Sequence, residues 1–297
     1  MTIPVNKPLV LDGRAAADAL LKTIKSDVDV LRQKGLRPPG LLVLQVGENP
    51  ASDAYIRQKK KAAEFCGFLF IHKKLSNKTS KEEILSEVQS SAEDSLIDGM
   101  IVQLPLDSAH SFTLEDVQEI LEKIPPSKDA DGLHSFNQGK LFTAESVPDR
   151  WSHPIPATPL GVYRLLEHYK ISMHSRDVTI VGKSRLVGLP TAVLAAHAGA
   201  TVTICNRLTK DLQSKTRHAD IVIVAAGKRH LIRPEHLKEG AVVVDVGMHV
   251  KEDGRLTGDV AHECYAKTSA YSPVPGGVGP MTVASLIENT YRLRVLV

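Results

Sequence analysis

The sequence predicts a two-domain α/β protein, because apolar segments of strand length alternate with amphipathic helical segments along both halves of the chain. Its 297 residues are enough for about two domains. Residues 125–156 are rich in Pro, Gly, Asp, Ser and Asn, and we interpret them as a long loop at the domain junction. Parallel strands need crossover connections, which are usually helices, so each domain is expected to contain a parallel sheet covered by helices.

The first half is expected to contain three strands and three helices in alternation. Apolar residues recur at helical spacing from Leu20 to Leu31, and Gly35 ends that first helix. Thr79 or Ser80, followed three residues later by Glu82 or Glu83, is typical of a capping box at the start of the third helix. The expected strands are 40–46, 68–72 and 100–103, and the later helices are 52–66 and 79–96.

The second half has the pattern of a doubly wound, Rossmann-like nucleotide-binding sheet. Helices are expected at 159–169, 189–197 and 281–293, and strands at 178–181, 201–205, 221–224 and 242–246. We expect the first domain to cover 1–156 and the second to cover 157–280. The C-terminal segment 281–297 is expected to pack back on the first domain.

Composition and charge narrow the classes of function. The 42% of hydrophobic and 24% of charged residues are ordinary for a globular protein. The net charge of +3 is small and the densest basic run is Lys59–Lys61, so we expect no nucleic-acid partner. No segment has the apolar length of a membrane span, and the N-terminus has neither a signal core nor an Arg-rich leader, so we expect no membrane partner and a cytoplasmic location.

Neither a metal site nor a covalent acyl-transfer site is expected. Cys66, Cys205 and Cys264 are far apart and form no Cys-x-x-Cys pair, which also argues against a disulfide framework. The twelve histidines form no ligand-spaced cluster, and Lys128–Gly132 has only two of the acids that a calcium loop needs. A Gly-x-Ser-x-Gly motif is absent from the sequence.

A candidate phosphate-binding turn lies between an expected strand and an expected helix. Gly182–Gly188 has this position, but Ser184 replaces the second glycine of Gly-x-Gly-x-x-Gly, so an ordinary strand-helix turn is an equally good interpretation. The next strand ends in Arg207 rather than in the acid that NAD sites usually carry. A cation there favours a 2′-phosphate, hence NADP, with Lys183 as a second positive charge. Both residues are alternatively plain surface cations.

Two features of the first half suggest a reactive site. Tyr55 and Lys59 are four residues apart on an expected helix, so their side chains share one face, although such pairs are usually structural. Gln103 follows an apolar strand at its carboxyl end, where α/β sheets place their ligands. The alternative is that the Gln103 amide only satisfies the end of the strand.

Two loops also have unusual compositions. Lys128–Gly132 contains two acids, which are either turn formers or a bidentate partner for the amino-pyrimidine edge of a pterin. Pro273–Thr282 contains three prolines and three glycines, a constrained backbone that can approach a ligand closely. We expect at least one of the peptide bonds Leu104–Pro105 and Val274–Pro275 to be cis.

Taken together, five ordered motifs resemble the bifunctional methylene-tetrahydrofolate dehydrogenase/cyclohydrolase family over nearly the whole chain. They are Tyr55–Lys59, Val102–Pro105, Lys128–Gly132, Gly182–Pro190 and Pro275–Thr282. The resemblance implies oxidation of 5,10-methylene-tetrahydrofolate with NADP, then hydrolysis to 10-formyl-tetrahydrofolate, in one-carbon metabolism and purine biosynthesis. It also implies tetrahydrofolate derivatives as ligands and a homodimer formed through the cofactor domain.

Carried over by position, the resemblance assigns roles to individual residues. Lys59 is the catalytic amine, Tyr55 stacks on the folate, Gln103 hydrogen-bonds to the lysine and Asp131 holds the pterin. The remaining residues of the implied folate pocket are Leu104, Gly279, Pro280 and Thr282. The implied cofactor contacts are Gly182, Lys183, Ser184, Arg207 and Met248.

The chain departs from the family pattern at two positions. Ala157 replaces a common cysteine, and His249 follows Met248 where Ile-Asn is usual. Residues 145–153 form a variable loop with no assigned role. A monofunctional dehydrogenase and a non-catalytic nucleotide-sensing module are the alternatives, and the intact Tyr55, Lys59 and Gln103 set argues against the first.

Overall fold

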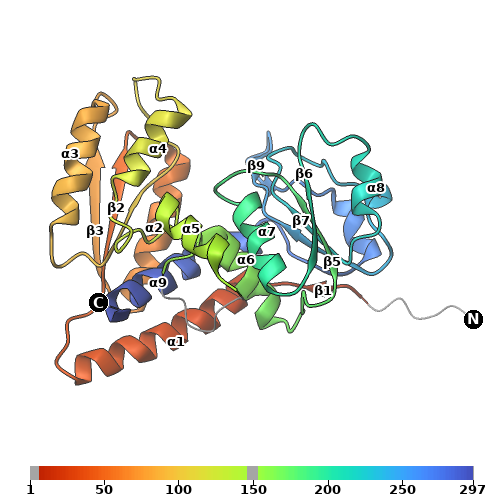
Figure 1. The fold of residues 1–297 in the computed structure, drawn as a ribbon, viewed down its shortest axis with the longest axis horizontal. Coiled ribbons are helices and arrows are strands. Elements are labelled where there is room, and N and C mark those ends of the chain that lie inside the picture. The colour runs from red at the N-terminus through yellow and green to blue at the C-terminus, as the bar shows by residue number, and fades with distance from the viewer. Residues whose placement is uncertain (1–6, 146–152, 297) are drawn as a thin grey trace, which may run out of the picture. The chain divides into compact units, whose positions relative to one another are not determined.

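The computed structural model describes residues 7–145 and 153–296, which divide into two compact units. The three-stranded unit contains the described residues of 18–140, 153–157 and 283–296. The six-stranded unit contains those of 7–17, 141–145 and 158–282. Each unit has its own parallel sheet, as the sequence predicts (Figure 1).

The sheet of the three-stranded unit has the order β3-β2-β4, with both pairs parallel. β2 (Gly40–Val46) is buried along its whole length, as a central strand covered on both faces must be. β3 (Leu69–Leu75) and β4 (Gly99–Val102) flank it. All three predicted strands are therefore confirmed, with β3 beginning one residue later and ending three residues later than expected.

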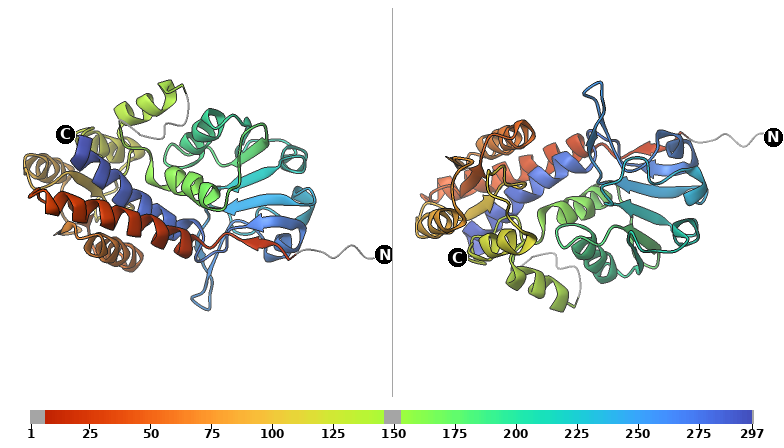
Figure 2. Two further views of the ribbon diagram at one scale, coloured as in Figure 1. Left: turned by 90° about the horizontal axis from the view of Figure 1, so that it is seen from below. Right: turned by 90° about the horizontal axis from the view of Figure 1, so that it is seen from above.

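Helices with well-formed N-caps surround this sheet. Asn49 caps α2 (Pro50–Phe65) by accepting from the amides of Ala51 and Ser52, and Ser80 and Glu83 form the predicted capping box of α3 (Lys81–Ala92). A core of Leu, Ile, Val and Met side chains joins α3 and α4 (Leu114–Glu122) to β2 and β4. α1 (Gly13–Gln33) and α9 (Val278–Leu296) run side by side in both views of Figure 2.

The prediction of a structureless loop over 125–156 is wrong in its middle part. Helix α5 (Ser135–Thr143) lies there, with Asn137 buried and its amide bonded to Pro126 O and the Asp129 carboxylate. Its sequence carries Gly139 and little apolar periodicity, so tertiary contacts rather than local pattern explain the helix. Helix α4 was likewise not expected. Most of the 145–153 loop lies outside the described residues.

The six-stranded sheet is parallel throughout and has the order β1-β11-β8-β7-β5-β6. The order reverses between β5 and β7, which makes their carboxyl ends the switch point of the sheet. The predicted strands are β5 (Asp177–Val181), β6 (Thr201–Cys205), β7 (Ile221–Val224) and β8 (Ala241–Asp245). The helices are α6 (Ala157–His168), α7 (Gly188–His197) and α8 (Leu212–Thr216), with two 3₁₀ turns at Pro234–His236 and His262–Lys267.

Four short strands were missed because none has a readable period. β1 (Leu9–Val10) pairs with β11 (Thr268–Tyr271), so the N-terminal segment joins the six-stranded sheet. β9 (His249–Val250) and β10 (Leu256–Thr257) form a separate antiparallel pair.

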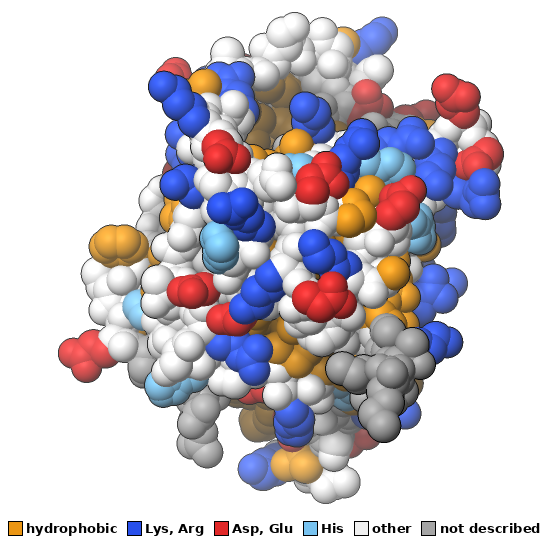
Figure 3. Space-filling model, turned by 90° about the vertical axis from the view of Figure 1, so that its right-hand side faces the viewer, with side chains coloured by type: hydrophobic (Ala, Val, Ile, Leu, Met, Phe, Trp, Pro, Cys, Tyr) orange, Lys and Arg blue, Asp and Glu red, His pale blue; other side chains and the backbone are white. Residues whose placement is uncertain are grey.

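Surface charge, the cysteines and the absence of certain features in the described residues bear on which classes of ligand the protein can bind. On the face drawn in Figure 3, basic and acidic side chains are interspersed over the centre. All three cysteines are buried free thiols. Within the described residues, no helix has the length and apolarity needed to cross a membrane, and no group of three or more His, Cys, Asp or Glu is arranged to hold a metal ion.

Candidate functional site

Helix α2 places Tyr55 and Lys59 on one face, one turn apart. Lys59 is only 7% exposed. Because lysine side chains are rarely buried without a partner, its amine is expected to have one. Tyr55 is partly buried, which raises the pKa of its phenol and keeps the ring neutral. Ser52, two turns before Lys59 on the same face, is 3% exposed, and its hydroxyl has no hydrogen-bond partner among the described residues.

Gln103 is the partner of the buried Lys59 amine. Lys59 Nζ donates to Gln103 Oε1 at 2.9 Å, and Gln103 Nε2 donates to Leu104 O at 2.7 Å. The second bond fixes the amide so that its oxygen, rather than its nitrogen, faces the lysine. Gln103 therefore both satisfies the strand end and holds the amine, which unites the two interpretations of the sequence.

The peptide bonds Leu104–Pro105 and Val274–Pro275 are both cis, which confirms the prediction that at least one of them would be.

A segment beside β4 carries Asp131 to the same place. Met100 N donates to Lys128 O and Ala130 N donates to Met100 O, so residues 128–130 run parallel to the strand. Two residues further along each segment, Asp131 approaches the carboxyl end of β4, where Gln103 follows the strand. The charges of Asp131 and Lys59 interact, so Lys59, Gln103 and Asp131, three of the four predicted catalytic residues, lie near one another. The fourth, Tyr55, lies one turn before Lys59 on α2.

The two acids of the Lys128–Gly132 loop have different environments. Asp129 is 2% exposed, and its carboxylate accepts from Leu133 N, His134 N and Asn137 Nδ2. It is thus the turn former, as one interpretation of the sequence required. Asp131 is partly buried and its charge interacts with that of Lys59, so it is the acid of this loop that lies near the Lys59–Gln103 pair.

Burial dominates the electrostatics of this pair. It lowers the pKa of Lys59, because a desolvated ammonium is disfavoured, and the negative charge of Asp131 opposes that shift. It also raises the pKa of Asp131, against the positive charge of Lys59. Burial makes the neutral form of the Lys59 amine more accessible than that of an exposed lysine, so an amine held in this way by an amide is suited to accept and return a proton.

In the six-stranded unit, the Gly182–Gly188 turn connects β5 to α7 as predicted. A Cβ at Gly188 would lie 2.0 Å from Gly182 O, so the turn closes on itself as only glycine permits. The Ser184 hydroxyl accepts from Val187 N and Gly188 N. Ser184, which stands in the place of the second glycine of the motif, therefore stabilises the turn through its hydroxyl. Lys183 and Ser184 stay exposed at the start of a ten-residue helix, which suits an anionic nucleotide.

The remaining predicted residues also belong to this unit or to the start of α9. Arg207 is exposed just beyond β6, and Met248 is 46% exposed beyond β8, both at the carboxyl edge of the sheet. Helix α9 begins at Val278, so Gly279, Pro280 and Thr282 lie in its first turns rather than in a preceding loop. Thr282 Oγ1 donates to Thr158 Oγ1 at 3.1 Å.

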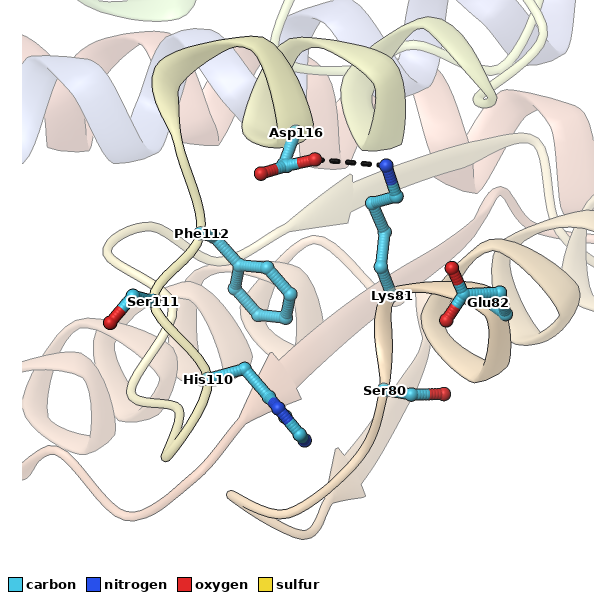
Figure 4. A pocket seen from close by; sticks show the side chains of 7 residues that line it. All are labelled: Ser80, Lys81, Glu82, His110, Ser111, Phe112 and Asp116. Atoms are coloured by element: carbon cyan, nitrogen blue, oxygen red, sulfur yellow. Dashed lines mark hydrogen bonds and ion pairs between the residues drawn. The ribbon is translucent and has the colours of Figure 1, made fainter.

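An open hollow of about 390 Å³ lies elsewhere, between the starts of α3 and α4 (Figure 4). It is lined by Ser80, Lys81, Glu82, His110, Ser111, Phe112 and Asp116. Lys81 donates to Asp116 at 2.8 Å and to Glu119 at 2.9 Å, so its charge is already neutralised. The hollow contains none of the predicted site residues.

Comparisons with known proteins decide the family. Models of tetrahydrofolate dehydrogenase/cyclohydrolase match residues 11–131 (catalytic domain) and residues 156–295 (NAD(P)-binding domain). The chain belongs to this family. Its relatives include the bifunctional protein FolD of Helicobacter hepaticus, 44% identical over 95% of both chains, and that of Helicobacter pylori, 42% identical over 97% of this chain and 96% of the relative.

Solved structures of family members have the same fold. The FolD methylenetetrahydrofolate dehydrogenase/cyclohydrolase of Campylobacter jejuni superposes with a TM-score of 0.89 at 40% identity, covering 97% of this chain and 99% of the other. The Trypanosoma brucei enzyme, in complex with NADP cofactor and inhibitor, gives 0.88 at 36% identity over 97% of each chain. The predicted family and fold class are thus confirmed.

The sequence did not single out several buried polar residues that organise the loops around the two candidate sites. Asn289 of α9 donates to Ala130 O and to Ile155 O, and so ties the C-terminal helix to the Asp131 loop. Asp245 and Asp259 hold backbone amides near Met248. None belongs to a motif with a recognisable spacing, so only the fold reveals them. His249 was noticed only as a departure.

Proposed function

We propose that this protein oxidises 5,10-methylene-tetrahydrofolate to the 5,10-methenyl form with NADP and hydrolyses that product to 10-formyl-tetrahydrofolate. The observation that carries the proposal is the buried Lys59–Gln103 pair beside Asp131, in a chain of the tetrahydrofolate dehydrogenase/cyclohydrolase family. The order of the two reactions follows from their chemistry, since the hydrolysis consumes the methenyl product of the oxidation.

In the oxidation, the residues of the protein supply position rather than proton transfer. The methylene carbon loses a hydride, and the remaining methenyl cation is delocalised over the two folate nitrogens. When bound, the nicotinamide cofactor supplies the hydride acceptor. Tyr55 would stack on the folate and Asp131 would bind the amino-pyrimidine edge of the pterin, which fixes the reacting carbon. Leu104, Gly279, Pro280 and Thr282 would complete the folate contacts.

The hydrolysis needs a proton acceptor near the same carbon. Water attacks the methenyl carbon and loses a proton, which gives a carbinolamine. The bond from that carbon to N5 then breaks as the hydroxyl loses its proton to become the formyl C=O, and N5 takes up a proton. Lys59 is suited to these transfers, because burial lowers the pKa of its amine and a nearby substrate cation would lower it further. Gln103 keeps the amine in place, because its side-chain oxygen accepts a hydrogen bond from Lys59 Nζ. An intact pair of this kind favours the bifunctional enzyme over a monofunctional dehydrogenase.

For the cofactor we propose NADP, held by Gly182, Lys183, Ser184, Arg207 and Met248. The exposed Arg207 at the carboxyl end of β6 and the lack of an acid there favour a 2′-phosphate. Replacing Arg207 by alanine should therefore raise the KM for NADP much more than the KM for NAD. Steady-state rates with each cofactor test this, and equal effects on the two KM values would contradict it.

We also propose the domain division and the cellular context. Residues 1–156 with 281–297 would form the catalytic domain and 157–280 the cofactor domain, and the Asn289 bonds to Ala130 and Ile155 support the return of α9 to the first domain. The protein would act in the cytoplasm, in one-carbon metabolism and purine biosynthesis. A homodimer formed through the cofactor domain completes the proposal.

One assay tests the central proposal. Purified protein is mixed with NADP and 5,10-methylene-tetrahydrofolate, and reduced cofactor and methenyl absorbance are followed together. Reduced cofactor with transient methenyl absorbance is expected for the bifunctional enzyme. Lasting methenyl accumulation at the uncatalysed hydrolysis rate would indicate a monofunctional dehydrogenase, and no reduced cofactor would indicate a nucleotide-sensing module.

A further inference from the structure

Two fully buried carboxylates organise the carboxyl edge of the six-stranded sheet. Asp245, the last residue of β8, accepts from Gly247 N and Asp259 N at 3.0 Å and from Val260 N at 2.9 Å. It is 1% exposed and Asp259 is 0% exposed. Buried carboxylates are retained only when donors satisfy them, so these bonds fix the course of the surrounding chain.

Asp259 extends this arrangement to the switch point of the sheet. Its Oδ2 accepts from Ala226 N at 2.7 Å and from Gly227 N at 2.9 Å, in the segment that follows β7. That segment touches the Gly182 turn, because a Cβ at Gly182 would lie 2.2 Å from Ala225 O. Ligands of open α/β sheets bind where these two strand ends diverge.

The other oxygen of Asp259 is held by His249. His249 Nε2 lies 2.7 Å from Asp259 Oδ1, and an ionised carboxylate only accepts, so the imidazole donates from Nε2. The histidine is the first residue of β9 and pairs with Thr257 of β10, while its ring is 22% exposed. Gly247 packs directly on Asp259, since a Cβ there would lie 2.3 Å from the carboxyl carbon.

We propose that His249 is a positioning residue of the cofactor site: by donating to Asp259, it fixes the carboxylate that orients the segment after β7 at the switch point. The inference rests on the proposed use of NADP. Removing the imidazole leaves one oxygen of a fully buried carboxylate without this donor. The carboxylate then reorients or draws in water, and the amides of Ala226 and Gly227 move with it.

The experiment compares wild type with His249→Leu and His249→Gln. Leucine removes the donor, whereas the side-chain amide of glutamine presents a neutral donor at a reach similar to that of Nε2. We expect His249→Leu to raise the Kd for NADP about tenfold, which corresponds to about 1.4 kcal/mol of binding free energy. The Kd for NADP is measured by titration calorimetry, and the KM for NADP should rise with it.

Two further readouts separate positioning from general damage. Hydrolysis of 5,10-methenyl-tetrahydrofolate uses no cofactor, so it should fall far less than NADP affinity in His249→Leu. His249→Gln should recover most of the affinity. His218→Leu is the matched control, because His218 is exposed and precedes the amino end of β7, at the opposite edge of the sheet. It should leave both the NADP affinity and the hydrolysis unchanged.

Three results would overturn the inference. They are equal NADP affinity of wild type and His249→Leu, equal losses in the leucine and glutamine variants, and a parallel loss of hydrolysis and NADP affinity. Wild-type protein that binds no NADP would instead overturn the proposed function.

Discussion

At the scale of single residues, Lys59 is distinguished by burial next to an amide whose orientation is fixed. The resemblance named Lys59, Gln103 and Asp131, and the structure shows why these three side chains meet. Sequence could not separate Asp129 from Asp131, because both acids lie in one polar loop. The difference appears only when three donors converge on Asp129.

Substituting Lys59 by arginine should separate the two activities. Arginine keeps a positive charge and a similar length, but its pKa is so far above that of an amine that no neutral form is accessible to accept a proton. Hydrolysis should fall on the order of a hundred- to ten-thousand-fold, the usual cost of losing positioned acid-base catalysis. Dehydrogenation should fall less, because it depends on geometry.

Both rates should be followed on one preparation of Lys59→Arg, after its binding of folate and NADP is confirmed. Near-wild-type hydrolysis would remove Lys59 from the proton chemistry. Equal losses of the two rates would assign it a purely positional role.

Replacing Gln103 by glutamate should move the pH profile of the hydrolysis upward. A carboxylate in place of the amide oxygen, 2.9 Å from Nζ, favours the ammonium form and raises the pKa of Lys59, which burial lowers in the wild type. Because the neutral amine accepts the proton, the rate rises with pH through this pKa. Gln103→Glu should thus be slow at neutral pH and recover in alkali.

Gln103→Met is the contrasting variant for this profile. It removes the hydrogen-bond acceptor of Lys59 without adding a charge, so the midpoint of the pH profile of the hydrolysis should not move upward. Identical profiles of the glutamate variant and the wild type would show that Lys59 does not titrate in the hydrolysis.

At the scale of elements, sequence located the long elements well and the short ones poorly. Continuous β-branched runs such as Ile221–Val224 predicted the central strands, because their short length and β-branched side chains favour a buried strand over a helix. Two-residue strands such as β1 and β9 have no period, and α5 is set by the bonds of Asn137 to its surroundings. The turn after β5 was placed correctly, although its Ser184 hydroxyl was not foreseen as the stabilising group.

The turn after β5 should not tolerate a side chain at Gly182. This residue has φ of +128°, and an added Cβ would lie 2.2 Å from Ala225 O. Gly182→Ala should lower the free energy of unfolding by on the order of 1–3 kcal/mol, and NADP affinity with it. Gly139→Ala, a helical position with no atom within 4 Å of the added Cβ, is the control and should be neutral or stabilising. Urea unfolding of both variants measures the difference in their free energies of unfolding. Equal midpoints would show that a side chain at position 182 causes no strain.

At the scale of the whole molecule, the proposed function assigns one ligand to each of the two parallel sheets. NADP would bind at the strand ends of the six-stranded sheet's switch point, and the folate would bind at the carboxyl end of β4 in the three-stranded sheet. In each unit, the loops that follow buried strands carry polar side chains of the proposed site, so the rigid sheet fixes the positions of these side chains. The pairing of β1 with β11 could not be foreseen, because the paired residues of these two short strands lie about 260 residues apart in the sequence.

The edge of the six-stranded sheet supports the proposed homodimer. β6 ends the sheet, and Ile204 on it is 42% exposed, while Leu208 just beyond it is 77% exposed. An edge strand with exposed apolar side chains favours pairing with another chain unless it is covered.

We therefore expect wild-type protein to sediment as a dimer at micromolar concentration. Ile204→Lys should shift the protein toward monomer, because a lysine buried in the contact would have to lose its hydration. Leu114→Lys, at a residue that is 91% exposed on α4, should leave the dimer intact. A wild-type monomer would contradict the homodimer, and a dimer that survives Ile204→Lys would place the contact on another surface.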